Sequence, residues 1–408
     1  MAALALYIHV PFCRRRCAYC DFASTAGQEA LIPAYVAALE REIVRQGRAL
    51  GRPAARQDSG RVATVYLGGG TPSLLTPSQV QAILTACRAA FDVAPAAEIT
   101  LEANPGTADV AYFAAIRVAG VNRLSLGVQS FDDGELALLG RIHTAAQAEA
   151  AYRDARAAGL DNVSLDLIYG LPGQSLRTWE QSLARAVALR PDHLSLYALE
   201  VHEDTLLGRR IGRGDLSTPD DDQAAAMYEH AEEVLAGAGF AHYEISNWAR
   251  FVGAGLASAQ VGDREGSPLR YDASICRHNL AYWRNEPYLG LGAAAHSWHD
   301  GERWWNVADP AAYIARVAAG RSPVAERQAI DQPTEMAETM FMGLRLVEEG
   351  VAFARFQARF GVDARDVYRQ ELRELQEVGL IAVQGDERVR LTRRGRLLGN
   401  EVFYRFVA

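Results

Sequence analysis

The segment Cys13-Arg-Arg-Arg-Cys17-Ala-Tyr-Cys20 follows the first apolar run of the chain, Leu4–Val10. Its spacing, C-x3-C-x2-C, lets three thiolates of one loop hold a [4Fe–4S] cube and leave the fourth iron open. An open iron can chelate the amino and carboxylate groups of S-adenosylmethionine (SAM). An electron from a low-potential cluster then cleaves the sulfonium to a 5′-deoxyadenosyl radical. The spacing therefore predicts a SAM-binding cluster on Cys13, Cys17 and Cys20.

Other interpretations of the triplet fit less well. Zinc usually takes four protein ligands, often from C-x2-C pairs, and His9 is the one nearby candidate for a fourth. A structural iron–sulfur cluster needs four cysteines. Thiols without a metal do not require this spacing, and Cys87 and Cys276 are isolated in the sequence.

Strand and helix patterns alternate through the first 240 residues. Six apolar runs predict strands: Leu4–Val10, Val62–Leu67, Glu98–Ala103, Asn122–Gly127, Val163–Ile168 and His193–Leu199. Segments with helical periodicity follow them: Ile32–Arg48, Pro77–Phe91, Asp109–Ala119, Ala145–Ala158, Ser175–Leu189 and Asp221–Gly237. Six such units predict an α/β fold with parallel strands, a partial (β/α)6 TIM-like barrel. A doubly wound open sheet is the alternative.

Polar and small residues stand at the ends of these predicted strands. The cysteines follow the first strand and Gly68-Gly69-Gly70-Thr71-Pro72 follows the second, while Glu102, Gln129, Asp166 and Tyr197-Ala198 belong to the other four. Because active sites of parallel barrels lie at the carboxyl ends of the strands, we expect one rim of ligand contacts. The glycines alone predict only a tight turn, and each polar residue alone is as easily a structural one. Beside the cysteines, bare backbone allows close approach of the methionine part of SAM.

The pattern changes after residue 240. We expect a radical SAM barrel over 1–240, a connecting segment over 241–324 and a separate domain over 325–408. Val252–Ser274 is rich in Gly, Ala and Ser and predicts a mobile loop. The last domain has expected helices at Met336–Val347, Phe353–Phe360 and Ala364–Val378, then a hairpin of Leu380–Val383 and Val389–Thr392. This order indicates a helical, winged-helix-like domain. Acids alternate with its arginines, which favours packing or partner docking over DNA binding.

Composition narrows the function further. The 408 residues carry a net charge of −8 and no lysine, which excludes a Schiff-base lysine and a Walker-type phosphate loop and gives no support for nucleic-acid binding. Apolar runs stay well below the roughly 18 residues that span a bilayer. The start of the chain lacks a basic leader and a cleavage site, so we expect a cytoplasmic protein.

Motifs along the whole chain resemble the oxygen-independent coproporphyrinogen III oxidase family. They are Tyr7-Ile-His-Val-Pro-Phe-Cys13, Gly68 to Pro72, Glu102-Ala-Asn-Pro105, Gly127-Val-Gln-Ser-Phe131 and Asp166-Leu-Ile-Tyr-Gly-Leu-Pro172. The resemblance implies a radical SAM partial barrel with a helical C-terminal domain. It places Tyr7, Tyr19, Gly69 and Glu102 around the cluster-bound SAM. The positions matching a second SAM site are Gly70, Thr71, Gln129, Arg141, Asp166 and Ala198.

The family has an oxidase branch and a heme-chaperone branch, and three features favour the second. The oxidases have a further cysteine where this chain has Phe22, and a longer segment before the motif than the 12 residues here. Arg277-His-Asn-Leu-Ala-Tyr-Trp283 is similar to the H-N-x-x-Y-W motif through which the chaperones are thought to hold heme. The resemblance therefore implies a heme chaperone that delivers heme to acceptor hemoproteins, with an electron donor and at most peripheral membrane contact. The alternative is radical decarboxylation of coproporphyrinogen propionates, and whether the chain turns SAM over is left open.

His278 is the expected ligand of the heme iron, because neutral imidazole is a common axial ligand. We then expect the rings of Tyr282 and Trp283 to stack on a porphyrin face, and Arg277 to pair with a heme propionate. Without the resemblance, the residues favour His278 and Asn279 as caps of a helix that begins near Leu280. Cys276 and His296 are rival ligands.

Overall fold

The computed structural model describes residues 3–50, 61–251 and 274–407. The expected mobile loop, Val252–Ser274, lies outside the described residues except for Ser274. Along the described chain, no helix is long and apolar enough to cross a membrane.

Six neighbouring parallel strands form the centre of the molecule, and they confirm the predicted partial barrel. They are β1 (Leu4–Val10), β4 (Val62–Gly69), β5 (Val93–Ala103), β6 (Arg123–Gln129), β7 (Val163–Tyr169) and β8 (His193–Ala198). They lie side by side in chain order, so each crossover moves one strand onward in the same direction. In a doubly wound sheet, successive strands would instead be added first on one side of the first strand and then on the other. The doubly wound alternative is therefore wrong.

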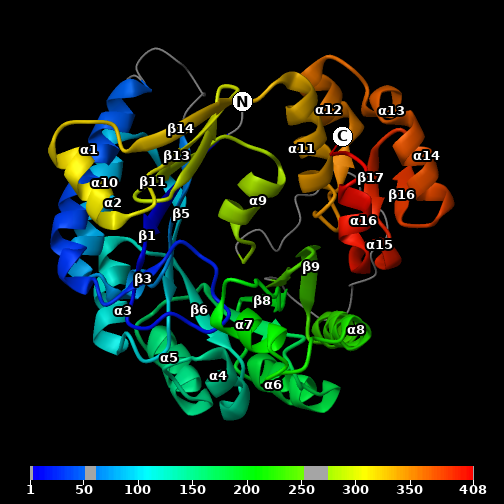
Figure 1. Ribbon diagram of the computed structural model, residues 1–408. Coiled ribbons are helices and arrows are strands. Elements are labelled where there is room, and N and C mark those ends of the chain that lie inside the picture. The colour runs from blue at the N-terminus through cyan, green and yellow to red at the C-terminus, as the bar shows by residue number, and fades with distance from the viewer. Residues whose placement is uncertain (1–2, 51–60, 252–273, 408) are drawn as a thin grey trace.

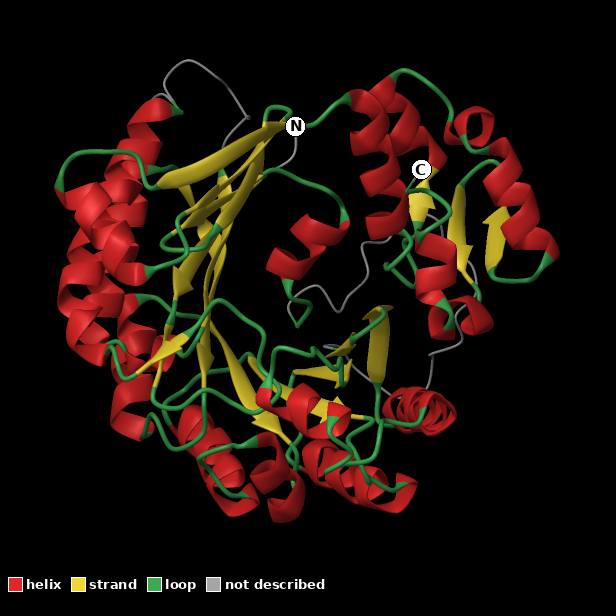
Figure 2. Ribbon diagram, viewed as in Figure 1, coloured by secondary structure: helices red, strands yellow, loops and turns green. Residues whose placement is uncertain are grey.

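Helices cover the outer face of this sheet (Figures 1 and 2). They are α1 (Ile32–Ala49), α2 (Pro77–Ala90), α3 (Val110–Ala119), α4 (Asp133–Leu139), α5 (Ala145–Ala157), α6 (Leu176–Ala188) and α8 (Asp221–Gly237). Capping boxes at Thr76, Thr144 and Ser175 fix the starts of α2, α5 and α6. Leu, Ile and Val side chains from strands and helices form one buried core between the two layers.

Later strands extend the same sheet at both edges. Beyond β8 lies β10 (Asn247–Arg250), which is antiparallel to β8, and then β9 (Phe240–Glu244), which is antiparallel to β10. Beyond β1 lie β11 (Tyr288–Leu291), which is parallel to β1, and then antiparallel β12 (His296–His299), β13 (Glu302–Asn306) and β14 (Val324–Ala329). The segment 241–324 thus contributes strands to the barrel sheet, and β14 begins at residue 324 and continues into the segment expected to belong to the last domain. Helix α10 (Pro310–Ala318) packs on α1.

The C-terminal domain has the expected helices and wing. Its elements are α11 (Gln332–Gly343), β15 (Val351–Ala352), α12 (Phe353–Phe360), α13 (Ala364–Val367), α14 (Arg369–Glu377), β16 (Ile381–Gln384), β17 (Arg388–Leu391), α15 (Arg393–Leu397) and α16 (Gly399–Phe403). Strands β15, β17 and β16 form a small sheet over a separate apolar core. The expected helix 364–378 is divided at Tyr368.

Charged contacts and one helix join this domain to the barrel. Arg393 and Arg396 of α15 pair with Glu232 of α8 at 3.1 and 2.9 Å. Helix α9 (Arg277–Trp283) lies between the sheet and the C-terminal domain (Figure 1), touching β4 on one side and α11 on the other. Two arginines beside the wing are therefore engaged in packing.

Candidate functional site

The cysteine loop is held at the carboxyl end of the barrel. Cys13 ends the short strand β2 (Phe12–Cys13), which pairs with β3 (Thr25–Ala26). The N–H of Ala18 donates to the carbonyl of Leu139 at the end of α4 (2.9 Å). The Ala18 carbonyl accepts from the N–H of Leu207 in α7 (Leu206–Gly212; 2.7 Å). Two helix ends therefore fix the loop from both sides.

Each sulfur of the triplet has a polar side chain beside it. The Thr71 hydroxyl donates to Sγ of Cys13 (3.5 Å), Nη1 of Arg141 donates to Sγ of Cys17 (3.2 Å), and Ser24 Oγ lies 4.0 Å from Sγ of Cys20. All three cysteines are free thiols. Burial raises the pKa of both Cys13 and Cys20, so the thiols need a partner to become thiolates.

This donor set fits a cysteine-held cube. Three thiols with hydrogen-bond donors behind the sulfurs are the surroundings that iron–sulfur ligands require. No three His, Cys, Asp or Glu side chains of the described ranges converge on a single metal ion. That finding does not conflict with a cube, because each cysteine of a cube binds a different iron.

The glycines after β4 are required by neighbouring protein groups. Gly69 has a φ of +113°, and a Cβ there would lie 2.6 Å from the His9 ring. A Cβ on Gly70 would lie 2.8 Å from the carbonyl oxygen of Phe12. The turn thus packs β4 tightly against the cysteine segment, which explains the glycines without a ligand.

Glu102, the last but one residue of β5, is hydrogen-bonded to the neighbouring strand β4. Its carboxylate accepts from the Tyr66 hydroxyl (2.7 Å) and from the N–H of Gly69 (3.1 Å). Burial raises the pKa of Glu102 to about 7, and the charge of Asp166 adds to the rise, although both hydrogen bonds oppose it. A buried carboxyl whose pKa is raised this far marks a candidate functional site.

Three other predicted rim residues belong to the next strands: Asp166 lies in the middle of β7, and Gln129 and Ala198 end β6 and β8. Asp166 of β7 accepts from Ser125 at 3.0 Å and Ser164 at 3.3 Å, and burial raises its pKa. Gln129, at the end of β6, has a φ of +69°, an uncommon conformation that gathers at functional sites. Ala198 is exposed at the end of β8.

Tyr7 lies in β1, before the cysteine loop, and Tyr19 lies within the loop. The Tyr7 hydroxyl shares a hydrogen bond with Nδ1 of His9 (3.1 Å), and its ring lies over that of Tyr66. Tyr19 packs against a small apolar group around Leu139 and Ile168.

Sequence reasoning missed Tyr66 and Asn104, which link the predicted residues. Tyr66 joins Glu102 to His278, and Asn104 joins Thr71 to Arg141. A signal for Tyr66 exists: Thr64, Tyr66 and Gly68 alternate with the buried Val65 and Leu67, so they share the inner face of β4. Asn104 stands in the motif Glu102-Ala-Asn-Pro105 but follows the last strand residue.

His278 lies in α9, and both of its ring nitrogens have partners. Nδ1 shares a hydrogen bond with the Thr64 hydroxyl (2.8 Å), and Nε2 with the hydroxyl of Tyr282 (3.3 Å). The side chain is almost fully buried, and its ring stacks on Tyr66. Burial, with the charge of Arg123, lowers the pKa of His278 to about 3, so the imidazole is neutral.

The start of α9 differs from the capping arrangement that the residues suggest. The helix begins at Arg277, and the carboxylate of Glu98 in β5 accepts from the N–H groups of Arg277 (2.9 Å) and His278 (3.1 Å). Glu98 of β5 therefore caps the helix, in place of the expected caps His278 and Asn279. The Arg277 guanidinium donates to the Ala96 carbonyl (2.6 Å).

The rival heme ligands have different surroundings. Cys276 is fully buried and its thiol donates to Glu98 (3.7 Å), while burial raises the pKa of Cys276 to about 12. His296 is exposed at the start of β12 and stacks on Trp305 with ring centroids 5.4 Å apart.

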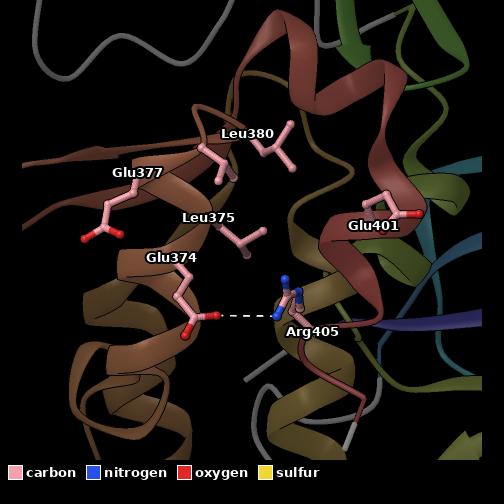
Figure 3. Close-up of a pocket in the computed structure, with 7 residues that line it drawn as sticks. Glu374, Leu375, Glu377, Leu380, Glu401 and Arg405 are labelled. Carbon is pink, nitrogen blue, oxygen red and sulfur yellow. Dashed lines mark hydrogen bonds and ion pairs between the residues drawn. The ribbon is translucent and has the colours of Figure 1, made fainter.

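A surface hollow lies elsewhere, in the C-terminal domain. It measures about 350 Å³ and opens between α14 and α16, where Glu374 and Arg405 form an ion pair of 3.4 Å (Figure 3). None of the residues that line it belongs to the cysteine site or to α9.

Comparison with known proteins gives matches over the full chain. Residues 7–186 match the model of the Radical SAM superfamily, and residues 330–398 match the HemN C-terminal domain. "Heme chaperone HemW" of Mycobacterium tuberculosis is 39% identical over 97% of this chain and 93% of that protein. "Heme chaperone HemW" of Bacillus subtilis is 35% identical over 98% of each chain.

A solved structure supports the fold. The structure described as "Coproporphyrinogen III oxidase (HemN) from Escherichia coli is a Radical SAM enzyme" superposes with a TM-score of 0.79. The superposition covers 99% of this chain and 89% of the oxidase chain, and the two sequences are 24% identical.

Proposed function

The chain belongs to the heme chaperone HemW family, and on this premise we propose that it binds heme and passes it to heme-accepting proteins. The observation that carries the proposal is 39% identity over 97% of the chain. The match includes both the barrel and the C-terminal domain, so the proposal concerns the entire molecule.

Cys13, Cys17 and Cys20 hold a [4Fe–4S] cluster in this proposal. When bound, such a cluster supplies the electron for reductive cleavage of SAM. Thr71 and Arg141 donate hydrogen bonds to two of the sulfurs and so stabilise their negative charge. The ends of α4 and α7 keep the loop backbone in place.

SAM is held beside the cluster by Tyr7, Tyr19, Gly69 and Glu102. The ionised carboxylate of Glu102 attracts the cationic groups of SAM or accepts from its ribose hydroxyls, and burial strengthens such contacts. The positions proposed for a second SAM molecule are Gly70, Thr71, Gln129, Arg141, Asp166 and Ala198. In support, Nε of Arg141 is buried and has no hydrogen-bond partner among the described residues.

His278 is the proposed ligand of the heme iron, through Nε2. Its imidazole is neutral, as iron ligation requires. Because the ring is buried, Nε2 must exchange the Tyr282 hydroxyl for iron. The 3.3 Å separation of these two atoms makes the hydroxyl a weak competitor.

The alternative function is coproporphyrinogen III oxidation. The likeness to the Escherichia coli oxidase supports it only through a shared fold at 24% identity. Phe22, which stands where the oxidases have a further cysteine, is 63% exposed beside the cysteine loop. This residue speaks against the oxidase chemistry.

The protein also needs an electron donor and a cellular compartment in which its thiols stay reduced. An electron donor reduces the cluster, and contact with membranes is peripheral at most. All five cysteines are free thiols, which suits a reducing compartment such as the cytoplasm.

Heme transfer tests the function. Anaerobically reconstituted protein is loaded with hemin, purified, and mixed with an apo-hemoprotein whose holo form has a distinct Soret band. We expect the acceptor spectrum to appear faster or more completely than with free hemin at the same concentration. A parallel reaction with coproporphyrinogen, SAM and reductant separates the alternatives: protoporphyrinogen formation without heme transfer would favour the oxidase.

A further inference from the structure

Asn104 joins the side chains that contact two of the three cysteines. Its Nδ2 donates to the hydroxyl of Thr71 (2.9 Å), and its Oδ1 accepts from Nη2 of Arg141. Thr71 in turn donates to Cys13 and Arg141 to Cys17. One amide therefore connects two sulfurs through two polar side chains. We call Thr71, Asn104 and Arg141 the clamp.

The chemistry of the clamp requires an amide at its centre. A guanidinium has only donors, so the atom of Asn104 that faces Arg141 must be the carbonyl oxygen. The Thr71 hydroxyl uses its hydrogen for Cys13, so it can only accept from Asn104. An aspartate would supply no donor to Thr71, and an apolar side chain would supply neither bond.

The surrounding backbone fixes the clamp. The backbone carbonyl of Asn104 accepts from the backbone N–H (3.1 Å) and the side-chain hydroxyl (2.6 Å) of Thr107. Arg141 also donates to the Gly127 carbonyl (2.6 Å), and a Cβ on Gly127 would lie 2.9 Å from Oδ1 of Asn104. The strand ends of β5 and β6 thus leave room for this arrangement and restrict it.

We propose that Asn104 is a positioning residue that aims Thr71 and Arg141 at Cys13 and Cys17, and thereby sets the reduction potential and retention of the cluster. The inference rests on the cluster proposed above. Hydrogen bonds to cysteine sulfurs withdraw negative charge, and the reduced cluster, which holds one more electron, gains more from them. A working clamp therefore makes the potential less negative and slows the loss of iron.

Asn104→Leu tests the proposal, because it keeps the approximate size and removes both bonds. The reduction midpoint of reconstituted protein is measured by an EPR-monitored redox titration, and iron loss is followed with a chelator. We expect a more negative midpoint and iron loss that is about 10-fold faster, because removal of an outer-shell partner typically weakens metal affinity by about 10-fold or more. Thr71→Val, which leaves Arg141 in place, should shift the midpoint in the same direction by less.

Asn122→Ala is the matched control. Asn122 also makes two hydrogen bonds between neighbouring strands, with Ile99 and Ala97, but at the start of β6. It should lower the melting temperature of the apo protein and leave the midpoint unchanged. A midpoint and iron-loss rate in both Asn104→Leu and Thr71→Val equal to those of the wild type would overturn the clamp. Wild-type protein that takes up no iron would instead overturn the cluster itself, and the clamp with it.

Discussion

The ring of Tyr66 stacks on that of His278, with centroids 4.9 Å apart and planes inclined by 24°. The hydroxyl of the same tyrosine donates to Glu102, the carboxyl proposed for SAM. One side chain of β4 thus touches both the proposed SAM site and the proposed heme ligand. The two sites are neighbours within the barrel, so changes at Tyr66 should be measured at both.

The affinity for SAM should rise with pH through about 7, because the pKa of Glu102 is raised to about 7 by burial. Below that pH the carboxyl is protonated and loses its attraction for the cationic ligand. Tyr66→Phe removes a hydrogen bond that lowers this pKa, so the midpoint of the pH profile should move upward. Calorimetric titration of SAM into cluster-loaded protein between pH 6 and 8.5 measures both profiles.

Glu102→Gln is the control for this profile, since it keeps the shape of the side chain and cannot ionise. It should bind SAM more weakly and without the midpoint near 7. An unchanged affinity in Glu102→Gln would remove Glu102 from the SAM site.

Loss of the cluster is expected on substitution of any one cysteine of the triplet. Cys13→Ala, Cys17→Ala or Cys20→Ala leaves two thiolates, which cannot hold a cube stably. Wild-type protein should carry about four irons per chain after anaerobic reconstitution. Cys87→Ala is the control, because Cys87 is buried in α2 within the apolar core. Full iron and sulfide content in Cys17→Ala would disprove the assignment.

The barrel is predictable from the sequence because its signals are local. The run Leu4–Val10 gives β1 at the expected bounds, and Asp221–Gly237 gives α8. Each strand of the parallel core is a short apolar run with a helix pattern after it, so the order of elements determines the topology. The edge strands lack this signal: β11 has four residues, and its pairing with β1 joins positions far apart in the chain.

The site is predictable only in part, because some of its contacts join residues that are far apart in the chain. Spacing identifies Cys13, Cys17 and Cys20, since the cluster motif is confined to eight positions. The link from Asn104 to Arg141 joins the residue after β5 to the segment after α4, 37 positions further along the chain, and no local pattern encodes it. The cap of α9 by Glu98 likewise joins residues 179 positions apart.

Coproporphyrinogen should remain unchanged when it is incubated with reconstituted protein, SAM and reductant. By the resemblance, the oxidases have a further cysteine where this chain has Phe22, whose ring has no thiol chemistry and lies mostly in solvent. Chromatography of the oxidised porphyrins measures any decarboxylation. Phe22→Cys is an informative second variant: if this position alone separates the branches, it should gain activity. Protoporphyrinogen from the wild-type protein would contradict the chaperone assignment.

Hemin binding should depend on His278 and should change little between pH 8 and 6. An ordinary histidine becomes protonated in this range, but the pKa of His278 is lowered to about 3 by burial and by the charge of Arg123. The imidazole therefore stays available to iron. The measurement is a titration of hemin followed by the Soret band, in wild type and His278→Ala. We expect the variant to lose the band or shift it markedly.

Two further variants separate His278 from its neighbours. Tyr282→Phe removes the hydroxyl that faces Nε2, so hemin affinity should rise or stay level if iron takes that nitrogen. Cys276→Ala removes the rival thiol, which burial keeps protonated with a pKa of about 12, and should leave the Soret band in place. A wild-type spectrum and affinity in His278→Ala, together with a shifted band in Cys276→Ala, would assign the iron to the thiolate. If His278→Ala keeps the wild-type spectrum and His296→Ala shifts the Soret band, the iron ligand is the exposed histidine of β12. That histidine lies outside the stack that Tyr66 forms with His278.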